Sequence, residues 1–299
     1  MTDFPTVRVA AAQATPVILD AKGCVDKAVE LLDKAAADGA RLLVLPECFV
    51  SLYPSGVWAA AAARFGGFDD LWRRMWEEAI DVDGPLVATL ARSCARHQIY
   101  LAIGVNERED IRPGSLYNTM LLIGPEGLIH RHRKTMPTMH ERLFYGIGSG
   151  DDLEVTSLPG VGRVGGLICW ENRMPMARWT LQQGGVQLWL APTADDSDGW
   201  LASMRHIAIE SGAFVISVPQ YLPRHAFPAD FPADIPDDLA VLGRGGACIV
   251  EPVEGTFIAG PIYDQEALLV ADCDLGRGLS AKRLFDSVGH YSRSEVLSP

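Results

Sequence analysis

Residues 164–218 have the sequence VGGLICWENRMPMARWTLQQGGVQLWLAPTADDSDGWLASMRHIAIESGAFVISV, and they say the most about the architecture. Short apolar runs alternate there with longer segments whose apolar residues recur at helical spacing. The expected elements are strand Val164–Ile168, helix Pro175–Gln183, strand Val186–Leu190, helix Trp200–Ser211 and strand Phe214–Val218. Such alternation is typical of an α/β fold, in which helices cover the outside of a sheet that contains parallel strands.

The rest of the chain extends this pattern in both directions. The further expected elements are strands Val7–Gln13, Leu42–Leu45, Ile99–Val105, Leu116–Ile123, Leu128–Lys134, Ala247–Val250 and Ala267–Asp272, and helices Asp20–Asp38, Trp58–Ile80 and Gly84–His97. The turn signal GPEG at 124–127 predicts a hairpin, so the sheet structure is mixed. The Pro- and Asp-rich segment 223–238 is expected to be a surface loop and does not resemble a linker. We therefore expect one domain over residues 1–299.

The composition argues against several classes of protein. Of 299 residues, 48% are hydrophobic and 21% are charged, which is ordinary for a globular protein. The net charge of -12 disfavours binding to nucleic acid or to an anionic membrane. No apolar run approaches the roughly 20 residues of a membrane span, and the first residues lack the pattern of a secretory signal. The six cysteines are scattered without a C-x-x-C pair, which indicates reduced thiols. We expect a cytoplasmic protein.

Three chemically active side chains, Glu47, Lys134 and Cys169, each stand at the end of a predicted strand. Taken alone, Cys169 is as well explained by a structural thiol in the core as by a nucleophile exposed in a strand–turn–helix elbow. Glu47 is as well explained by a solvated loop carboxylate as by a buried, paired one. If the three strands belong to one sheet, the three side chains converge at its edge. The polar loop 135–146, which follows Lys134 and includes Glu141, lies where α/β proteins usually build a site.

Two other motifs favour structural interpretations. Residues 160–165 match G-x-G-x-x-G, but a strand follows them where a nucleotide site requires a helix, so a plain turn is the better account. His130 and His132 lie in a basic run without further metal-ligating residues at familiar spacing. We interpret this run as a hairpin strand with alternating exposed faces.

The three candidate residues lie in motifs of a known family. The segments LPE (45–47), RKTMPT (133–138) and ICWEN (168–172) resemble the three catalytic boxes of the nitrilase superfamily of carbon–nitrogen hydrolases. The resemblance covers almost the whole chain. It implies an α/β fold of the αββα type, a four-layer sandwich with mixed sheets. It also implies catalytic roles for Glu47, Lys134 and Cys169, with Glu141 as a supporting second glutamate.

The cysteine box is similar to that of the true nitrilase branch. Amidases and carbamoylases of the superfamily usually have Asp two residues after the cysteine, whereas this chain has Glu171, preceded by Trp170. The resemblance implies hydrolysis of a small-molecule nitrile to the carboxylic acid and ammonia through a thioimidate and a thioester. Amide or carbamoyl hydrolysis by the same residues is the alternative. A catalytically silent assembly or binding protein is the alternative from another class, and the intact set of three residues argues against it.

The chemistry of these residues requires no metal and no organic cofactor. We expect the Lys134 cation to favour the Cys169 thiolate, and Glu47 to act as the general base. Lys134 and the backbone N–H of Trp170 are expected to stabilise the developing anion. Tyr53, Trp170 and Thr193 are candidates for the wall of the substrate pocket, with core packing as the alternative for the aromatic residues.

The family resemblance also implies a homo-oligomer, a dimer or larger, with a filament as the extreme case. The apolar, Trp-rich stretch from Trp58 to Trp76 suits the core of an interface. Many nitrilases have a longer C-terminal tail after the segment that matches residues 288–293. This chain has six residues there, 294–299, so we make no prediction for the length of a filament.

Overall fold

The computed structural model, which describes residues 4–109, 111 and 113–297, contains two mixed sheets. The first has six strands in the order β13 (Ala267–Asp274), β1 (Thr6–Gln13), β2 (Leu42–Val44), β3 (Tyr100–Arg108), β4 (Leu116–Gly124) and β5 (Gly127–Arg133). The second has seven, in the order β10 (Tyr221–Pro223), β11 (Val241–Val250), β9 (Phe214–Pro219), β8 (Leu188–Thr193), β7 (Gly162–Gly166) and β6 (Thr156–Leu158), with β12 (Phe257–Tyr263) paired to β11.

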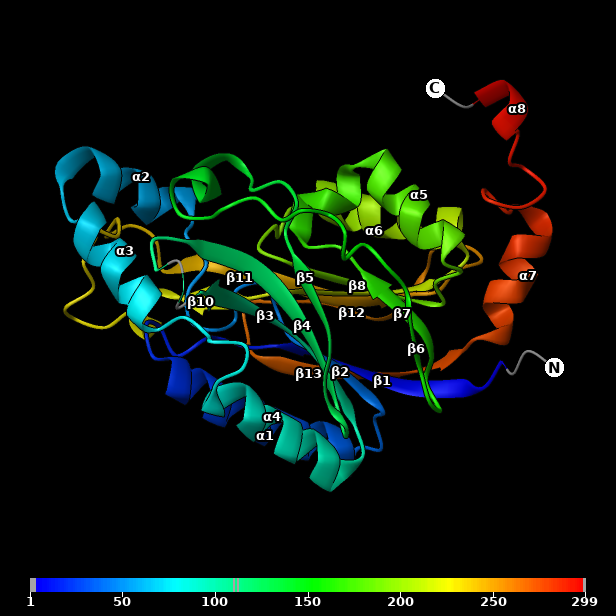
Figure 1. Cartoon of the computed structure of the whole chain (residues 1–299), viewed down its shortest axis with the longest axis horizontal. Coiled ribbons are helices and arrows are strands. Elements are labelled where there is room, and N and C mark those ends of the chain that lie inside the picture. Colours follow the sequence, from blue (N-terminus) through cyan, green and yellow to red (C-terminus); the bar gives the residue numbers. More distant parts are fainter. Residues whose placement is uncertain (1–3, 110, 112, 298–299) are drawn as a thin grey trace.

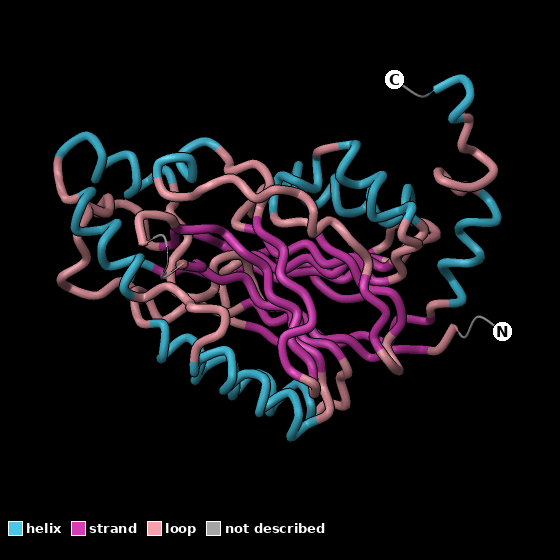
Figure 2. The backbone as a smooth tube through the Cα atoms, viewed as in Figure 1, coloured by secondary structure: helices cyan, strands magenta, loops and turns pink. Residues whose placement is uncertain are grey.

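The two sheets pack face to face between two layers of helices (Figure 1). Helices α1 (Ala21–Ala37) and α4 (Pro85–His97) cover the first sheet, and α5 (Pro175–Gln183) and α6 (Asp198–Ser211) cover the second. A strand in this arrangement must bury both of its faces, and the side chains of β1 alternate between the helices and the second sheet. Ala10 and Ala12 pack toward α1 and α4, whereas Val9 and Ala11 pack against the second sheet. Figure 2 shows the strands as one double layer between the helices. The expected αββα sandwich is confirmed.

The stretch 58–80 forms two helices, α2 (Gly56–Phe65) and α3 (Phe68–Glu77), where the sequence predicted one. Gly66 and Gly67 separate them with φ angles of +100° and +88°, a region that favours glycine and ends a helix. Trp58 is fully buried, with its ring 5.2 Å from that of Phe227. The argument that this stretch supplies an interface is therefore wrong for Trp58, because its side chain already packs inside the chain.

The remaining differences concern short segments. Strands β6, β10 and β12 were not predicted, and β11 begins six residues before the expected Ala247–Val250. The expected loop 223–238 begins at the last residue of β10 and contains the short 3₁₀ turn η3 (Arg224–Ala226). The glycine motif at 160–165 forms the turn between β6 and β7, as predicted. At the C-terminal end, α7 (Gly276–Leu284) buries Gly278 and Ala281 against the body of the molecule, whereas α8 (Ser294–Leu297) extends away from it (Figure 1).

Candidate active site

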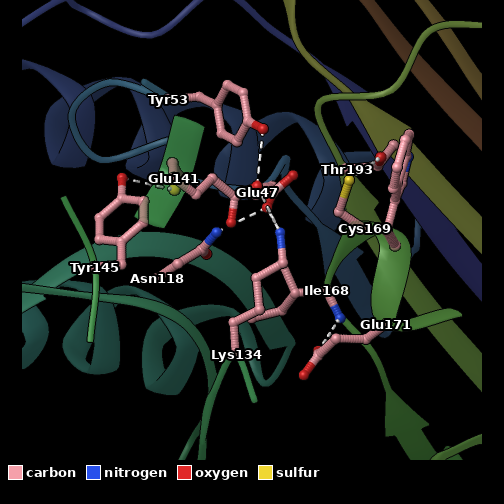
Figure 3. Close-up of polar contacts among 12 residues, drawn as sticks. Glu47, Tyr53, Asn118, Lys134, Glu141, Tyr145, Ile168, Cys169, Glu171 and Thr193 are labelled. Atoms are coloured by element: carbon pink, nitrogen blue, oxygen red, sulfur yellow. Dashed lines mark hydrogen bonds and ion pairs between the residues drawn. The ribbon is translucent and has the colours of Figure 1, made fainter. Parts of the chain in front are cut away.

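The three predicted residues meet, but they come from two sheets. Glu47 follows β2 and Lys134 follows β5, both in the first sheet, whereas Cys169 follows β7 in the second. The expectation of a single sheet is therefore wrong. Convergence depends on the face-to-face packing of the sheets, and Figure 3 shows the three side chains gathered in one region.

The Lys134 ammonium lies between two carboxylates. Its Nζ is 2.7 Å from Glu47 Oε1 and 2.8 Å from Glu141 Oε1, and all three side chains are buried. Glu141 comes from the 3₁₀ turn η1 (Met139–Leu143) in the loop after Lys134. Burial lowers the pKa of Lys134, but the negative charges around it outweigh burial and raise the pKa well above its ordinary value. Lys134 is therefore a permanent cation at the centre of the site.

Glu47 is held by contacts that the sequence did not predict. The side chain of Asn118 on β4 donates to Glu47 Oε1 at 2.7 Å, and Gln220 donates to the Glu47 carbonyl at 2.8 Å. The other carboxylate oxygen, Oε2, is buried and has no hydrogen-bond partner among residues 4–109, 111 and 113–297. Burial raises the pKa of Glu47 despite the Lys134 cation, and the nearby charge of Glu141 raises it further. This carboxylate is therefore a stronger base than an exposed glutamate.

Cys169 begins the 3₁₀ turn η2 (Cys169–Arg173) with a φ of +50°, which a residue with a side chain rarely adopts. The side chain of Asn172 stabilises this turn by donating to the carbonyls of Leu167 at 2.7 Å and Cys169 at 2.9 Å. The strand, strained turn and following helix α5 match the predicted elbow. The thiol, however, was expected to be exposed, and Cys169 is only 3% exposed.

The Cys169 thiol is neutral in this environment. Burial and then the charge of Glu47 raise its pKa to about 12, although Lys134 acts in the opposite direction. The Lys134 cation therefore favours the thiolate, in the expected direction, but does not outweigh burial and the charge of Glu47. The sulfur accepts a hydrogen bond from the Thr193 hydroxyl at 3.2 Å. Attack by this sulfur requires a base that takes the proton as the new bond forms.

A cavity of about 590 Å³ reaches Cys169. Tyr53 and Trp170 line it, as predicted for the pocket wall, together with Met139 and His140. The Tyr53 hydroxyl also donates to Glu141 Oε1 at 2.8 Å, so this residue contacts the charged centre. The indole N–H of Trp170 donates to Asp195 Oδ2 at 2.8 Å, which fixes the ring at the cavity wall. Thr193 is fully buried, and its hydroxyl contacts the nucleophile.

The other cysteine near the site is Cys48, which directly follows Glu47. It is fully buried, and its sulfur lies 3.4 Å from the Tyr145 hydroxyl. Burial and the adjacent Glu47 charge raise its pKa well above the ordinary value. Cys48 does not line the cavity that reaches Cys169. In the part of the chain that the structure describes, no group of three or more His, Cys, Asp or Glu side chains is arranged to hold a metal ion.

Comparison with known proteins defines the class of this fold and site. Residues 8–283 match the model of the carbon–nitrogen hydrolase family, and the chain belongs to this family. Among solved structures, the fold is similar to that of the C. elegans NitFhit protein, with a TM-score of 0.78 and 19% identity over 99% of this chain and 67% of that chain. It is also similar to Saccharomyces cerevisiae Nit3, with a TM-score of 0.74 and 19% identity over 96% of this chain and 97% of that chain.

Within the family, the relatives point to the nitrilase branch. The chain is 45% identical over 276 residues to a nitrilase from Bradyrhizobium diazoefficiens, which covers 90% of this chain and 84% of that protein. It is 43% identical over 301 residues to an aliphatic nitrilase from Sinorhizobium fredii, and the alignment covers 99% of this chain and 94% of that protein. A bifunctional nitrilase/nitrile hydratase from Nicotiana tabacum is 41% identical over 302 residues, and the alignment covers 98% of this chain and 85% of that protein. The predicted membership in the true nitrilase branch is confirmed.

Proposed function

We propose that the chain hydrolyses an organic nitrile to the carboxylic acid and ammonia, with Cys169 as the nucleophile. The observation that supports this most is the Lys134 ammonium between two buried carboxylates, beside a buried thiol at a cavity. The nitrilase relatives support the nitrile as the substrate class.

In the first half of the reaction, Glu47 takes the proton of the Cys169 thiol. The sulfur attacks the nitrile carbon, one bond of the carbon–nitrogen triple bond opens, and the nitrogen receives a proton from Glu47. The product is a neutral thioimidate on Cys169. The raised pKa of Glu47 suits both transfers, because the group is basic enough to take the proton and acidic enough to return it. Lys134 and the Trp170 backbone N–H stabilise the negative charge that develops on the nitrogen.

In the second half, two waters are consumed. Glu47 removes a proton from the first water, whose oxygen adds to the thioimidate carbon, and returns that proton to the nitrogen. The proton of the new hydroxyl group is then transferred to the nitrogen, the carbon–nitrogen bond breaks, and ammonia leaves a thioester. A second water, activated in the same way, releases the carboxylic acid and restores the thiol. Glu141 holds Lys134 in place during both steps, since its Oε1 contacts Nζ at 2.8 Å. No step requires a metal or an organic cofactor.

The test is ammonia release from matched nitrile and amide pairs, such as phenylacetonitrile with phenylacetamide and butyronitrile with butyramide. We expect at least one nitrile to give a higher kcat/KM than its amide. Faster release from every amide would contradict the proposal and favour the amidase alternative. No ammonia from any pair would favour the silent-scaffold alternative.

The proposal also covers the domain organisation, the cellular location and the oligomeric state of the enzyme. A single domain over 1–299 is supported by the pairing of β1 with β13, which joins the two ends of the chain in one sheet. A cytoplasmic location is supported by the six free cysteines. No helix in the described residues is long and apolar enough to cross a membrane. A homo-oligomer is supported by two exposed apolar side chains at the start of α5, Met174 at the N-cap and Met176 in the first turn, the latter at 66% exposure.

A further inference from the structure

A buried carboxylate outside the predicted site connects the two catalytic turns. Glu171 lies in η2, two residues after Cys169, and is 1% exposed. Its Oε2 accepts hydrogen bonds from the Ile168 backbone N–H at 2.8 Å and from His132 Nε2 at 2.9 Å. Its Oε1 accepts from both the backbone N–H and the hydroxyl of Thr135, each at 2.6 Å. All four donors therefore converge on one side chain.

Two of these donors lie next to catalytic residues in the sequence. Ile168 directly precedes Cys169, after β7 of the second sheet, and Thr135 directly follows Lys134, after β5 of the first. One carboxylate thus binds the peptide group beside the nucleophile and the peptide group beside the lysine. Figure 3 shows the Glu171 carboxylate below Cys169, bonded to the backbone N–H of Ile168.

His132 supplies the charge that makes this arrangement stable. Its Nε2 contacts Glu171, and its Nδ1 lies 2.9 Å from Asp152 Oδ1, while Asp152 Oδ2 accepts the Arg133 backbone N–H. An ionised carboxylate can only accept, so both ring nitrogens of His132 must bear protons. Burial lowers the pKa of His132, but its hydrogen bonds to Asp152 and Glu171 raise it to about 9. The ring is therefore a buried cation between two anions at neutral pH.

We propose that Glu171, supported by His132 and Asp152, is a positioning residue that sets the Cys169 sulfur relative to Lys134 and Glu47. The apolar side chains between the sheets resist separation but are not directional. Hydrogen bonds to a charged group are directional and strong. A displacement of about 1 Å at a reacting centre can cost about 10²-fold in rate. The inference rests on the proposed roles of Cys169 and Glu47.

The test is Glu171→Gln, with Glu251→Gln as the matched control. Glutamine has the same shape, but its amide nitrogen would face N–H or O–H donors, so about half of the four hydrogen bonds would be lost. Glu251 is also buried and accepts from three backbone N–H groups, from the Thr256 hydroxyl and from Arg277. It follows Val250, which pairs with Val215 near the start of β9, whereas Gln220 beside Glu47 follows the end of that strand. That separates the control from the site by roughly 17 Å of strand.

Two quantities are measured per folded molecule, with the folded fraction taken from circular dichroism. The first is kcat and KM for phenylacetonitrile and butyronitrile. The second is the rate of Cys169 alkylation by iodoacetamide between pH 7.5 and pH 9. For Glu171→Gln we expect kcat and the alkylation rate at pH 7.5 to fall about 10²-fold while KM changes little. The alkylation rate should then rise with pH, because the displaced thiol depends on hydroxide. Glu251→Gln should keep the wild-type values in both measurements.

Wild-type kcat and an unchanged alkylation profile in folded Glu171→Gln would overturn the inference, because the network would then serve stability alone. If Glu171→Gln does not fold, His132→Gln replaces it. That variant can still donate to Glu171 but loses the charge and the second hydrogen bond. It should lower kcat with KM little changed, and an unchanged kcat would overturn the inference. If the wild type hydrolyses neither nitrile, the proposed function fails, but the alkylation rates still test the positioning.

Discussion

Two buried cysteines adjoin Glu47, and the structure distinguishes them by access. Cys169 lines the cavity, whereas Cys48 contacts Tyr145 in the interior. We predict that Cys169→Ala abolishes turnover with the fold intact, and that Cys48→Ala keeps a kcat close to that of the wild type. Steady-state ammonia release measures both, and peptide mapping after treatment with iodoacetamide should find the inactivating label on Cys169. A label on Cys48 that accounts for inactivation would reverse the assignment.

The role of Glu47 as base predicts a distinct pH profile. The Cys169 thiol has a pKa of about 12, so in the wild type its reaction at neutral pH depends on proton transfer to Glu47. Its alkylation rate should then vary little between pH 7.5 and pH 9. Glu47→Gln cannot accept the proton, so the rate should be lower at pH 7.5 and rise about tenfold per pH unit below the thiol pKa. A flat profile in Glu47→Gln, equal to that of the wild type, would remove Glu47 from this role.

At the scale of elements, the position of Glu47 depends on how closely β3 approaches the segment after β2. A Cβ atom at Gly104 would lie 2.4 Å from the Pro46 carbonyl oxygen and 2.6 Å from Glu47 Cα. We predict that Gly104→Ala displaces Glu47 and lowers kcat about 10²-fold, with a loss of thermal stability. The control is Gly114→Ala, since Gly114 is exposed and a Cβ there would have no neighbour within 4 Å among the residues that the structure describes. Equal kcat values for the two variants would show that the loop tolerates the displacement.

The elements also show which features the sequence could predict. Apolar periodicity predicted helices α1, α4, α5 and α6 and most of the strands, but not β6, β10, β12, α7 or α8. The ends of predicted strands indicated Glu47, Lys134 and Cys169. The break at Gly66-Gly67 was visible as a glycine pair but was outweighed by the apolar residues on both sides. Asn118 and Gln220 could not be found, because each is a single polar residue whose role arises only when β4 or β9 lies next to Glu47. The predicted exposure of the Cys169 thiol was wrong for a similar reason, since the burial of a turn depends on the elements that pack over it.

At the scale of the whole molecule, His132 links stability to pH. Its pKa is 6.5 in the unfolded chain and about 9 in the folded one, where it contacts Asp152 and Glu171, with His130 nearby. The folded state therefore binds more protons between these values, and its stability falls as pH rises through about 9. We predict that the free energy of unfolding in urea decreases from pH 7 to pH 9.5, and that His132→Gln reduces this slope. An equal slope in both proteins would contradict the charged state of His132.

The assembly belongs to the same scale. We predict a dimer or larger oligomer, because apolar side chains on α5 and α6 are exposed, including Met176 and Ile209. Light scattering on the purified chain should give at least twice the monomer mass. A monomer mass at working concentration would contradict the prediction. The Trp-rich stretch that first suggested an interface is not the reason, since Trp58 packs inside the chain.

The central claim is that nitrile hydrolysis proceeds through a covalent bond to Cys169, and its most direct test is the mass of the enzyme during turnover. The reaction with phenylacetonitrile or butyronitrile is quenched in acid within milliseconds, and the intact chain and its peptides are weighed. The account predicts a fraction of enzyme that bears the thioimidate or the acyl group on the Cys169 peptide, and none in Cys169→Ala. Ammonia release at the wild-type rate by Cys169→Ala, or an adduct on any other residue, would contradict it.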